Sequence, residues 1–316
     1  MFLLILPAAG ALAAIGLFCF RPPVLIVTDA AFASLYGPAR ITAKRIETSA
    51  ALLRRVQPVM VDDTAGPDMV AFAVEKAGGS PYCVLFPYRY NEGAGRYAEK
   101  FPQTPVFIVG GGQNARVKGT VLVGTDIMTD LYRAGLCAGI IARNSGRDVL
   151  FFQGEALPEE QREAFQEGLR ERGFEKKPKY LSANQDYSDN ENIACVVMNG
   201  QAAPFLDRNL ETPVILFSWL DPELTAASVK VIFDDSPWAL AARIVRMIPG
   251  RNGIDRIDST EETLPVAEVV PSDILFPGRR VLDTNILRDL KKAAHKSSIK
   301  NKGRISLSMK LLSSLK

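Results

Sequence analysis

From Pro22 onward, short apolar runs alternate with segments that have helical periodicity, and this alternation strongly restricts the fold. The runs are continuous rather than alternating in polarity, which is typical of parallel strands buried on both faces. Repeated strand–helix units favour doubly wound parallel sheets with right-handed crossovers. Strands are expected at 22–27, 57–63, 81–88, 104–112, 119–126, 148–155, 178–183, 192–199, 212–221, 229–235 and 263–270. Helices are expected at 38–56, 66–79, 91–102, 127–143, 157–173 and 237–248.

The number of strands suits two sheets better than one, because strongly twisted open sheets seldom exceed about ten strands. We therefore predict the α/β class with two Rossmann-like lobes, parallel sheets and a connecting hinge, the chain first crossing near 122–126. The N-terminal lobe is expected to contain residues 22–123 and about 236–258. The C-terminal lobe is expected to contain residues 124–235 and about 259–278.

The first twenty residues carry no charged side chain. In a helix they would span about 30 Å, the thickness of a bilayer core, and they are too long for one buried strand. Residues 1–21 are therefore predicted to be an export signal or an uncleaved membrane anchor, with the body outside the cytoplasm. Cys19 lies where a bacterial lipoprotein cysteine would lie, although bulky Phe18 precedes it, so lipidation, anchoring and ordinary cleavage all stay open.

Charge is unevenly distributed along the chain. Residues 279–316 hold eleven Lys/Arg and two Asp, which leaves 27 basic and 33 acidic side chains in the rest. A mildly acidic body argues against nucleic-acid binding. The basic tail is predicted to be disordered, with a marginal helix or a contact with a lipid surface as alternatives.

Few residues are available for metal or acid–base chemistry. The single histidine, His295, lies in the tail, and the four cysteines, three of which are Cys83, Cys137 and Cys195, are widely separated. The cysteines therefore indicate buried apolar side chains rather than a disulfide framework or zinc site. The sequence predicts no enzyme activity, no cofactor and no metal.

Ligands of doubly wound sheets bind outside the carboxyl ends of the strands. In two lobes these ends would face each other across a cleft. The strand ends here are rich in aromatic, carboxylate and amide side chains, which suit a planar or polyhydroxylated ligand. Thr28, Arg89 and Gln153 belong to this wider set. The predicted ligand residues are Asp29, Phe32, Tyr36, Tyr88, Tyr90, Gln113, Asp126, Glu155, Tyr187, Asn199, Trp219, Asp221, Asp235 and Trp238.

Two alternatives apply to this set. The aromatic side chains could simply pack the edges of the lobes. Asp234 or Asp235 could cap the helix expected from Pro237, because an acid or serine before a first-turn proline is an ordinary helix start. The glycines of VGGGQN lack the spacing of a dinucleotide-binding loop.

The stretch VLVGTDIMTDLYRAGLCAGIIARNSGRDVLFFQGEALPEEQREAFQEGLRERG resembles the type I periplasmic binding proteins, as does the later SVKVIFDDSPWALAARIV. The resemblance covers roughly residues 23–275 and is greatest to nucleoside-binding and related solute-binding lipoproteins. GGGQN stands where sugar-binding members often carry an Asp-Arg pair.

The resemblance implies a monomeric solute-binding protein of an ABC-type importer that binds a nucleoside, a flavin or a sugar-like molecule. Its partners would be membrane permease subunits. A membrane-tethered ligand sensor is the alternative, and an α/β enzyme fits least well.

Overall fold

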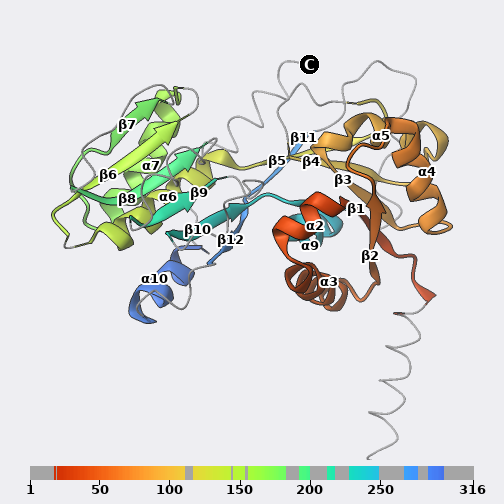
Figure 1. Cartoon of the computed structure of the whole chain (residues 1–316), viewed down its shortest axis with the longest axis horizontal. Coiled ribbons are helices and arrows are strands. Elements are labelled where there is room, and N and C mark those ends of the chain that lie inside the picture. The colour runs from red at the N-terminus through yellow and green to blue at the C-terminus, as the bar shows by residue number, and fades with distance from the viewer. Residues whose placement is uncertain are drawn as a thin grey trace, which may run out of the picture. The chain divides into compact units, whose positions relative to one another are not determined.

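The structure is a computed structural model of the whole chain (Figure 1). It describes Phe18 and residues 20–110, 117–143, 145–153, 156–182, 192–199, 212–217, 228–248, 267–276 and 284–294. The predictions at Cys19, Gln113, Glu155, Tyr187, Trp219 and Asp221 lie outside the described residues.

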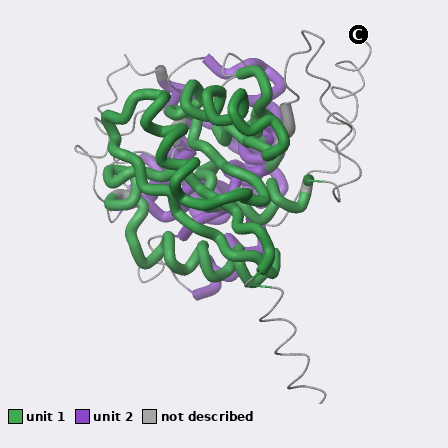
Figure 2. Tube along the Cα trace, turned by 90° about the vertical axis from the view of Figure 1, so that its right-hand side faces the viewer, with its two compact units in different colours: residues 1–125, 235–270 green, residues 126–234, 271–316 purple. Residues whose placement is uncertain are grey.

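The chain divides into two compact units (Figure 2). Unit 1 contains residues 1–125 and 235–270, and unit 2 contains residues 126–234 and 271–316. The chain thus passes between the units after Thr125, after Asp234 and after Val270. The last passage differs from the expectation, which assigned 259–278 to the second lobe, because residues 267–270 extend the first sheet instead.

Unit 1 is a parallel sheet with helices on both faces (Figure 1). Helices α4 and α5 pack together, and α3 packs with α9. Its elements are β1 (Val24–Asp29), α2 (Ala30–Tyr36), α3 (Pro38–Leu52), β2 (Val56–Val61), α4 (Pro67–Ala77), β3 (Cys83–Pro87), a 3-10 turn (Tyr88–Tyr90), α5 (Asn91–Lys100), β4 (Val106–Val109), β5 (Val121–Thr125), α9 (Pro237–Met247) and β11 (Ala267–Val270).

The strand order of unit 1 is β11-β5-β4-β3-β1-β2, and all five pairings are parallel. β1 and β3 are buried on both faces, as their continuous apolar sequences predict. Short α2 was not among the expected helices. It follows β1 directly and begins because the Asp29 side chain accepts a hydrogen bond from the Phe32 amide at 2.8 Å.

Unit 2 repeats this plan. Its elements are α6 (Ile127–Ala142), β6 (Asp148–Gln153), α7 (Glu159–Glu171), β7 (Lys179–Ser182), β8 (Ile193–Asn199), β9 (Val214–Leu216), β10 (Val229–Asp234), β12 (Asp273–Leu275) and α10 (Thr284–Ala294). The strand order is β12-β10-β9-β8-β6-β7. Three-residue β12, which no sequence pattern indicated, pairs antiparallel with β10.

Helix α10 lies in the tail that was predicted to be disordered. Leu290 and Ala293 are buried, and Ile286 and Leu287 pack against the same core. Their spacing places them on one side of the helix, which contacts α6. The basic residues that dominate the tail obscured this short apolar stripe. Residues 295–316 lie outside the described residues.

Unit 2 buries a carboxyl group where the chain enters β12. Asp130 of α6 is 1% exposed, and its oxygens accept hydrogen bonds from the Ser272 amide and hydroxyl, the latter at 2.6 Å. Arg133 donates to the Ser272 carbonyl at 3.3 Å. Burial raises the pKa of Asp130 to about 7, although Ser272 and Arg133 act to lower it.

We expect Asp130 to make stability depend on pH. Because its folded-state pKa lies above the ordinary value of 3.8, its contribution is fully present below pH 3.8 and is lost as the pH rises through about 7. The free energy of unfolding of the wild type, relative to that of Asp130→Asn, should therefore fall by about 2 kcal/mol between pH 5 and pH 7.5. Urea unfolding of both proteins at the two pH values measures this, and a constant difference would contradict it.

Candidate functional site

Both sheets have a topological switch point, which is where ligands of doubly wound folds bind. In unit 1 the chain proceeds from β1 to β2 on one side and continues from β3 on the other. The carboxyl ends of neighbouring β1 and β3 lead into Asp29 and into Tyr88–Tyr90. In unit 2 the switch point lies between β6 and β8, where Gln153 pairs in register with Asn199.

Asp29 is the centre of a polar cluster at the unit 1 switch point. Its side chain is 1% exposed. Oδ2 accepts a hydrogen bond from the Tyr90 hydroxyl at 3.0 Å and lies 3.2 Å from the Arg89 guanidinium. Oδ1 caps α2. These contacts satisfy the buried carboxylate, so Asp29 positions its neighbours more than it presents oxygen atoms at the surface.

Arg89 is the charged group that this cluster presents to solvent. Its side chain is 44% exposed, and its second terminal nitrogen donates to the Asp63 carbonyl at 3.0 Å. The guanidinium also lies over the Tyr90 ring, 4.9 Å from its centroid. These contacts with Asp29, Asp63 and Tyr90 fix the position of the guanidinium. Its other N–H groups can donate to an acceptor at the edge of the sheet.

Two tyrosines flank Arg89 and differ in accessibility. Tyr88 is 42% exposed, whereas Tyr90 is buried. Burial and the Asp29 carboxylate together raise the pKa of Tyr90, so its hydroxyl stays protonated and continues to donate to Asp29. An exposed ring beside a fixed guanidinium suits a ligand with an apolar face and polar substituents.

Among the residues that the structure describes, two buried side-chain polar atoms of unit 1 have no hydrogen-bond partner. They are the Thr28 hydroxyl, one residue before Asp29 at the end of β1, and the indole nitrogen of Trp238 in the first turn of α9. Buried polar groups are nearly always hydrogen-bonded, so such atoms call for a water or a ligand. Thr28 lies near the carboxyl end of β1, and Trp238 lies just after the chain passes from β10 of unit 2 into unit 1.

Other predicted residues are buried in unit 1. Phe32 and Tyr36 stack at 5.1 Å between centroids on α2, and Trp238 is 1% exposed. Asp235 is partly buried at the second passage between the units. Ser236, not either aspartate, caps α9 by accepting from the Ala239 amide.

In unit 2, Asp126 caps α6, accepting from the Thr129 amide at 3.1 Å and hydroxyl at 2.6 Å. Buried Gln153 accepts from the Leu157 amide at 3.2 Å. Asn199 ends β8, and its side chain lies outside the described residues.

The predicted set of ligand residues omitted Arg89. The sequence Tyr-Arg-Tyr at the end of a strand was the signal that could have indicated it.

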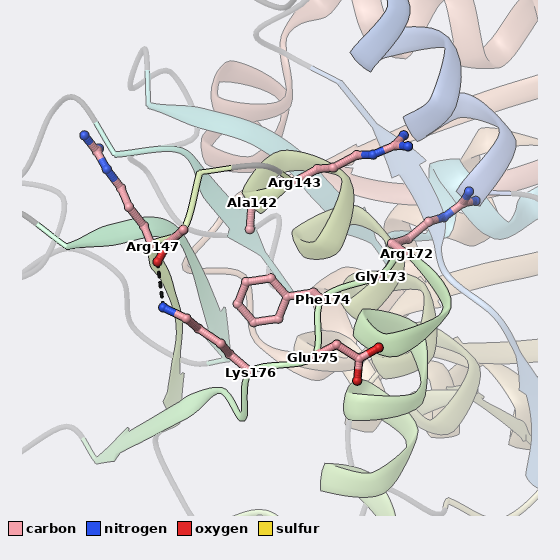
Figure 3. Close-up of a pocket in the computed structure, with 9 residues that line it drawn as sticks. Ala142, Arg143, Arg147, Arg172, Gly173, Phe174, Glu175 and Lys176 are labelled. Carbon is pink, nitrogen blue, oxygen red and sulfur yellow. Dashed lines mark hydrogen bonds between the residues drawn. The ribbon is translucent and has the colours of Figure 1, made fainter.

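A basic cavity of about 480 Å³ lies at the opposite, amino-terminal end of the unit 2 sheet (Figure 3). It is lined by Arg143, Arg147, Arg172 and Lys176 around the buried Phe174 ring. Arg143 and Arg172 follow the last turns of α6 and α7, where cations offset the helix dipoles. No predicted ligand residue lines it.

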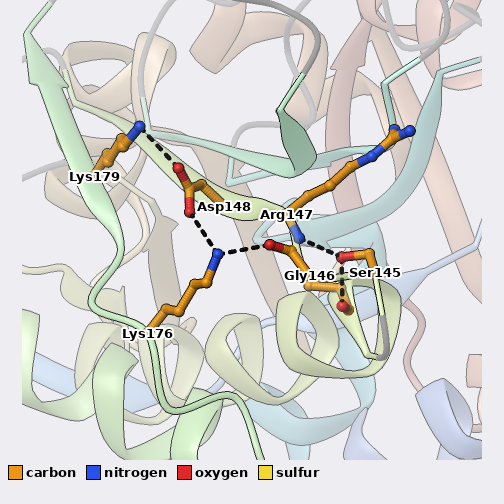
Figure 4. A network of polar contacts seen from close by, with 7 residues as sticks. Ser145, Gly146, Arg147, Asp148, Lys176 and Lys179 are labelled. Atoms are coloured by element: carbon orange, nitrogen blue, oxygen red, sulfur yellow. Dashed lines mark hydrogen bonds and ion pairs between the residues drawn. The ribbon is translucent and has the colours of Figure 1, made fainter.

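A network of ion pairs fixes the start of β6 beside this cavity (Figure 4). Asp148 lies 2.8 Å from the Lys179 amine and 3.4 Å from that of Lys176, which also donates to the Gly146 carbonyl at 2.6 Å. The hydrogen bond from Lys179 is the main cause of a lowered Asp148 pKa. The contacts with Asp148 and Gly146 account for the positions of Lys176 and Lys179 without a ligand.

The described part of the chain contains no group of His, Cys, Asp or Glu side chains placed to hold a metal ion. Burial raises the pKa values of the Cys83 and Cys137 thiols to about 12, and that of the fully buried Cys195 thiol is raised as well. None of these three thiols is poised to act as a nucleophile.

No protein-family model matches the chain, and no curated protein matches its sequence. Solved structures do match. A transcriptional activator of the comK gene from Bacillus halodurans superposes with a TM-score of 0.52 at 10% identity, covering 86% of this chain and 95% of its own.

An ABC transporter solute-binding protein from Conexibacter woesei gives a TM-score of 0.48 at 14% identity, covering 79% of this chain and 85% of its own. A carbohydrate transporter solute-binding protein from Agrobacterium radiobacter, in complex with D-arabinose, gives 0.40 at 14%, covering 85% and 98%. Identities this low show the fold alone. The expected fold class, α/β with two Rossmann-like units built on largely parallel sheets, is confirmed.

Proposed function

We propose that the chain is an extracytoplasmic solute-binding protein of an ABC-type importer, which binds a small polar or planar-ring ligand. The observation that carries this proposal is the Asp29–Arg89–Tyr90 cluster at the switch point of the unit 1 sheet. The ligand would lie against Tyr88 and accept hydrogen bonds from Arg89. A sugar-like molecule, a nucleoside or a flavin offers such a face and such acceptors.

The first twenty residues support a location at a membrane, because an uncharged segment of that length suits export or anchoring. We propose that residues 1–21 attach the protein to the membrane, through the segment itself or through lipid on Cys19. Among the residues that the structure describes, no helix is long and apolar enough to span a bilayer. The permease subunits of the importer would be the partners of a monomeric carrier.

Release of a bound molecule tests the proposal most directly. The full chain, purified in detergent, is denatured, and small molecules in the supernatant are identified by mass spectrometry and absorbance. Thermal-shift screening with pentoses, hexoses, nucleosides and flavins follows. We expect one class to be released or to stabilise the protein. If no small molecule is released and no member of the panel stabilises the protein, the proposal is overturned.

A membrane-tethered ligand sensor is the second candidate, because the matched structures of this fold include named regulators of transcription as well as transport proteins. Both candidates need the same ligand edge and differ in the partner. Co-purification with permease subunits from membranes favours import, whereas co-purification with a kinase or cyclase favours sensing.

A further inference from the structure

Helix α3 of unit 1 has an unusually exposed surface. Thr48 is its one fully buried residue among those whose side chains are described. Ile46, Ala50 and Leu53 follow the helical spacing that places residues on one side, and all three are exposed, Ile46 at 62% and Leu53 at 52%. Large apolar side chains aligned on a solvated face indicate an interaction surface.

Leu53 has a backbone conformation that its side chain disfavours. It ends α3 with a φ of 50°, in the left-handed region, and its amide donates to the Ala50 and Ser49 carbonyls. Glycine is the usual residue for this position at a helix end. Gly173 has a comparable conformation two residues after the end of α7, with a φ of 77°. Retaining leucine where glycine would fit better, with the side chain in solvent, indicates that the side chain has a use.

An apolar groove of about 410 Å³ runs beside this stripe. Phe18, Ile46, Ala50 and Val56 contribute its apolar walls, and Arg45 and Arg55 stand at its rim. Phe20, next to the groove in sequence, is 91% exposed. We call this surface, formed by Phe18, Phe20, Arg45, Ile46, Ala50, Leu53 and Arg55, the α3 face.

The charges around the α3 face are largely of one sign. Between Phe18 and Gln57 the sequence has six arginines or lysines and two acids. Of the acids, Asp29 is buried at the far end of β1, and Glu47 pairs with Lys44 at 3.3 Å. Arg45 and Arg55 form no ion pair within the described part of the chain. Such cations attract an anionic surface, and the apolar side chains between them can enter it.

The apolar segment of the sequence leads directly to this face, since Phe18 of that segment lines the groove. We propose that the α3 face rests on the surface of a bilayer containing anionic phospholipid. The proposal rests on the membrane attachment proposed above. The face lies at the amino-terminal end of β1 and β2, whereas Asp29 ends β1 at the carboxyl edge. Unit 1 would thus hold its ligand edge about 17 Å from the lipid-facing end of β1.

Tryptophan quenching tests the contact with lipid. Ile46→Trp and Met69→Trp are introduced separately into the full chain, and the proteins are reconstituted into vesicles of phosphatidylglycerol and brominated phosphatidylcholine. Met69 is the matched control, because it is exposed at 63% on α4 of the same unit. We expect the fluorescence added by I46W to be quenched at least twofold more than that added by M69W. Equal quenching of the two would overturn the proposal.

A second variant separates lipid contact from folding. Leu53→Gly should raise the midpoint of thermal unfolding, because it relieves the left-handed strain, yet lower the quenching of I46W when the two are combined. Quenching that is unchanged in L53G would count against the face. Vesicles of brominated phosphatidylcholine alone should quench I46W less, and equal quenching would remove the role of the arginines.

Flotation of the full chain distinguishes this proposal from the ones before it. If the chain floats with vesicles but I46W is not quenched, the proposed membrane attachment stands and the proposed contact of the α3 face is overturned. If the chain does not float, both proposals are overturned. Ligand release is measured independently, so neither result bears on solute binding.

Discussion

Gly135→Ala is expected to destabilise unit 2 by on the order of 4 kcal/mol or more, enough to lower its thermal midpoint by about 10 °C. Helices α6 and α7 approach each other backbone to backbone at Gly135 and Gly168. A Cβ at Gly135 would lie 2.1 Å from the Phe165 carbonyl oxygen, and one at Gly168 would lie 2.1 Å from that of Tyr132. Because these neighbours are main-chain atoms, they can give way only if the helices separate.

The same pair of helices supplies graded controls. Gly168→Ala should match Gly135→Ala. Gly139→Ala should cost less, since its Cβ would lie 2.8 Å from the Arg172 Cβ and 3.2 Å from the Leu169 carbonyl oxygen, which are wider spacings than the 2.1 Å at Gly135. Gly66→Ala, in unit 1 with nothing within 4 Å, should change stability by less than about 1 kcal/mol. Circular dichroism melts of the four variants measure the series, and a Gly135→Ala midpoint equal to that of Gly66→Ala would contradict the packing argument.

The sequence predicted the regular elements of the fold better than the short ones. The alternation of apolar runs and helical segments was sufficient to predict parallel sheets in two units, because burial on both faces leaves a continuous apolar pattern. It was not sufficient for short elements such as β12 and α2, which have too few residues to show a period. β12 depends on β10, a partner far along the chain, whereas α2 depends on a single local cap by Asp29.

The candidate site shows the same division. The rule that ligands bind at carboxyl ends led directly to Asp29, Tyr88 and Tyr90. It could not assign roles, because Asp29 and Tyr90 are separated by 61 residues and no sequence pattern reports which side chains pair. The pairing makes Asp29 a buried support and leaves Arg89 as the exposed donor. Sequence analysis included Asp29 among the predicted ligand residues and placed Arg89 only in the wider set of strand-end residues.

Arg89→Met should therefore weaken ligand binding by about 10-fold to 100-fold, the range expected when a charged hydrogen-bond donor is lost. The measurement is isothermal titration with the molecule identified by release from the wild-type protein. The midpoint of thermal unfolding should fall modestly, because buried Asp29 loses the Arg89 cation but keeps its bonds to Tyr90 and the Phe32 amide.

Arg96→Met is the matched control, since Arg96 is a more exposed arginine of the same unit that pairs with Asp68 and Glu99 on the surface. The Arg96→Met variant should bind the ligand with the affinity of the wild type. Arg89→Lys separates charge from geometry, because lysine keeps the charge but cannot present a planar fork of donors. If Arg89→Met and Arg96→Met bind the ligand equally well, the cluster at the end of β1 and β3 is structural, and the ligand site must be sought at another strand end.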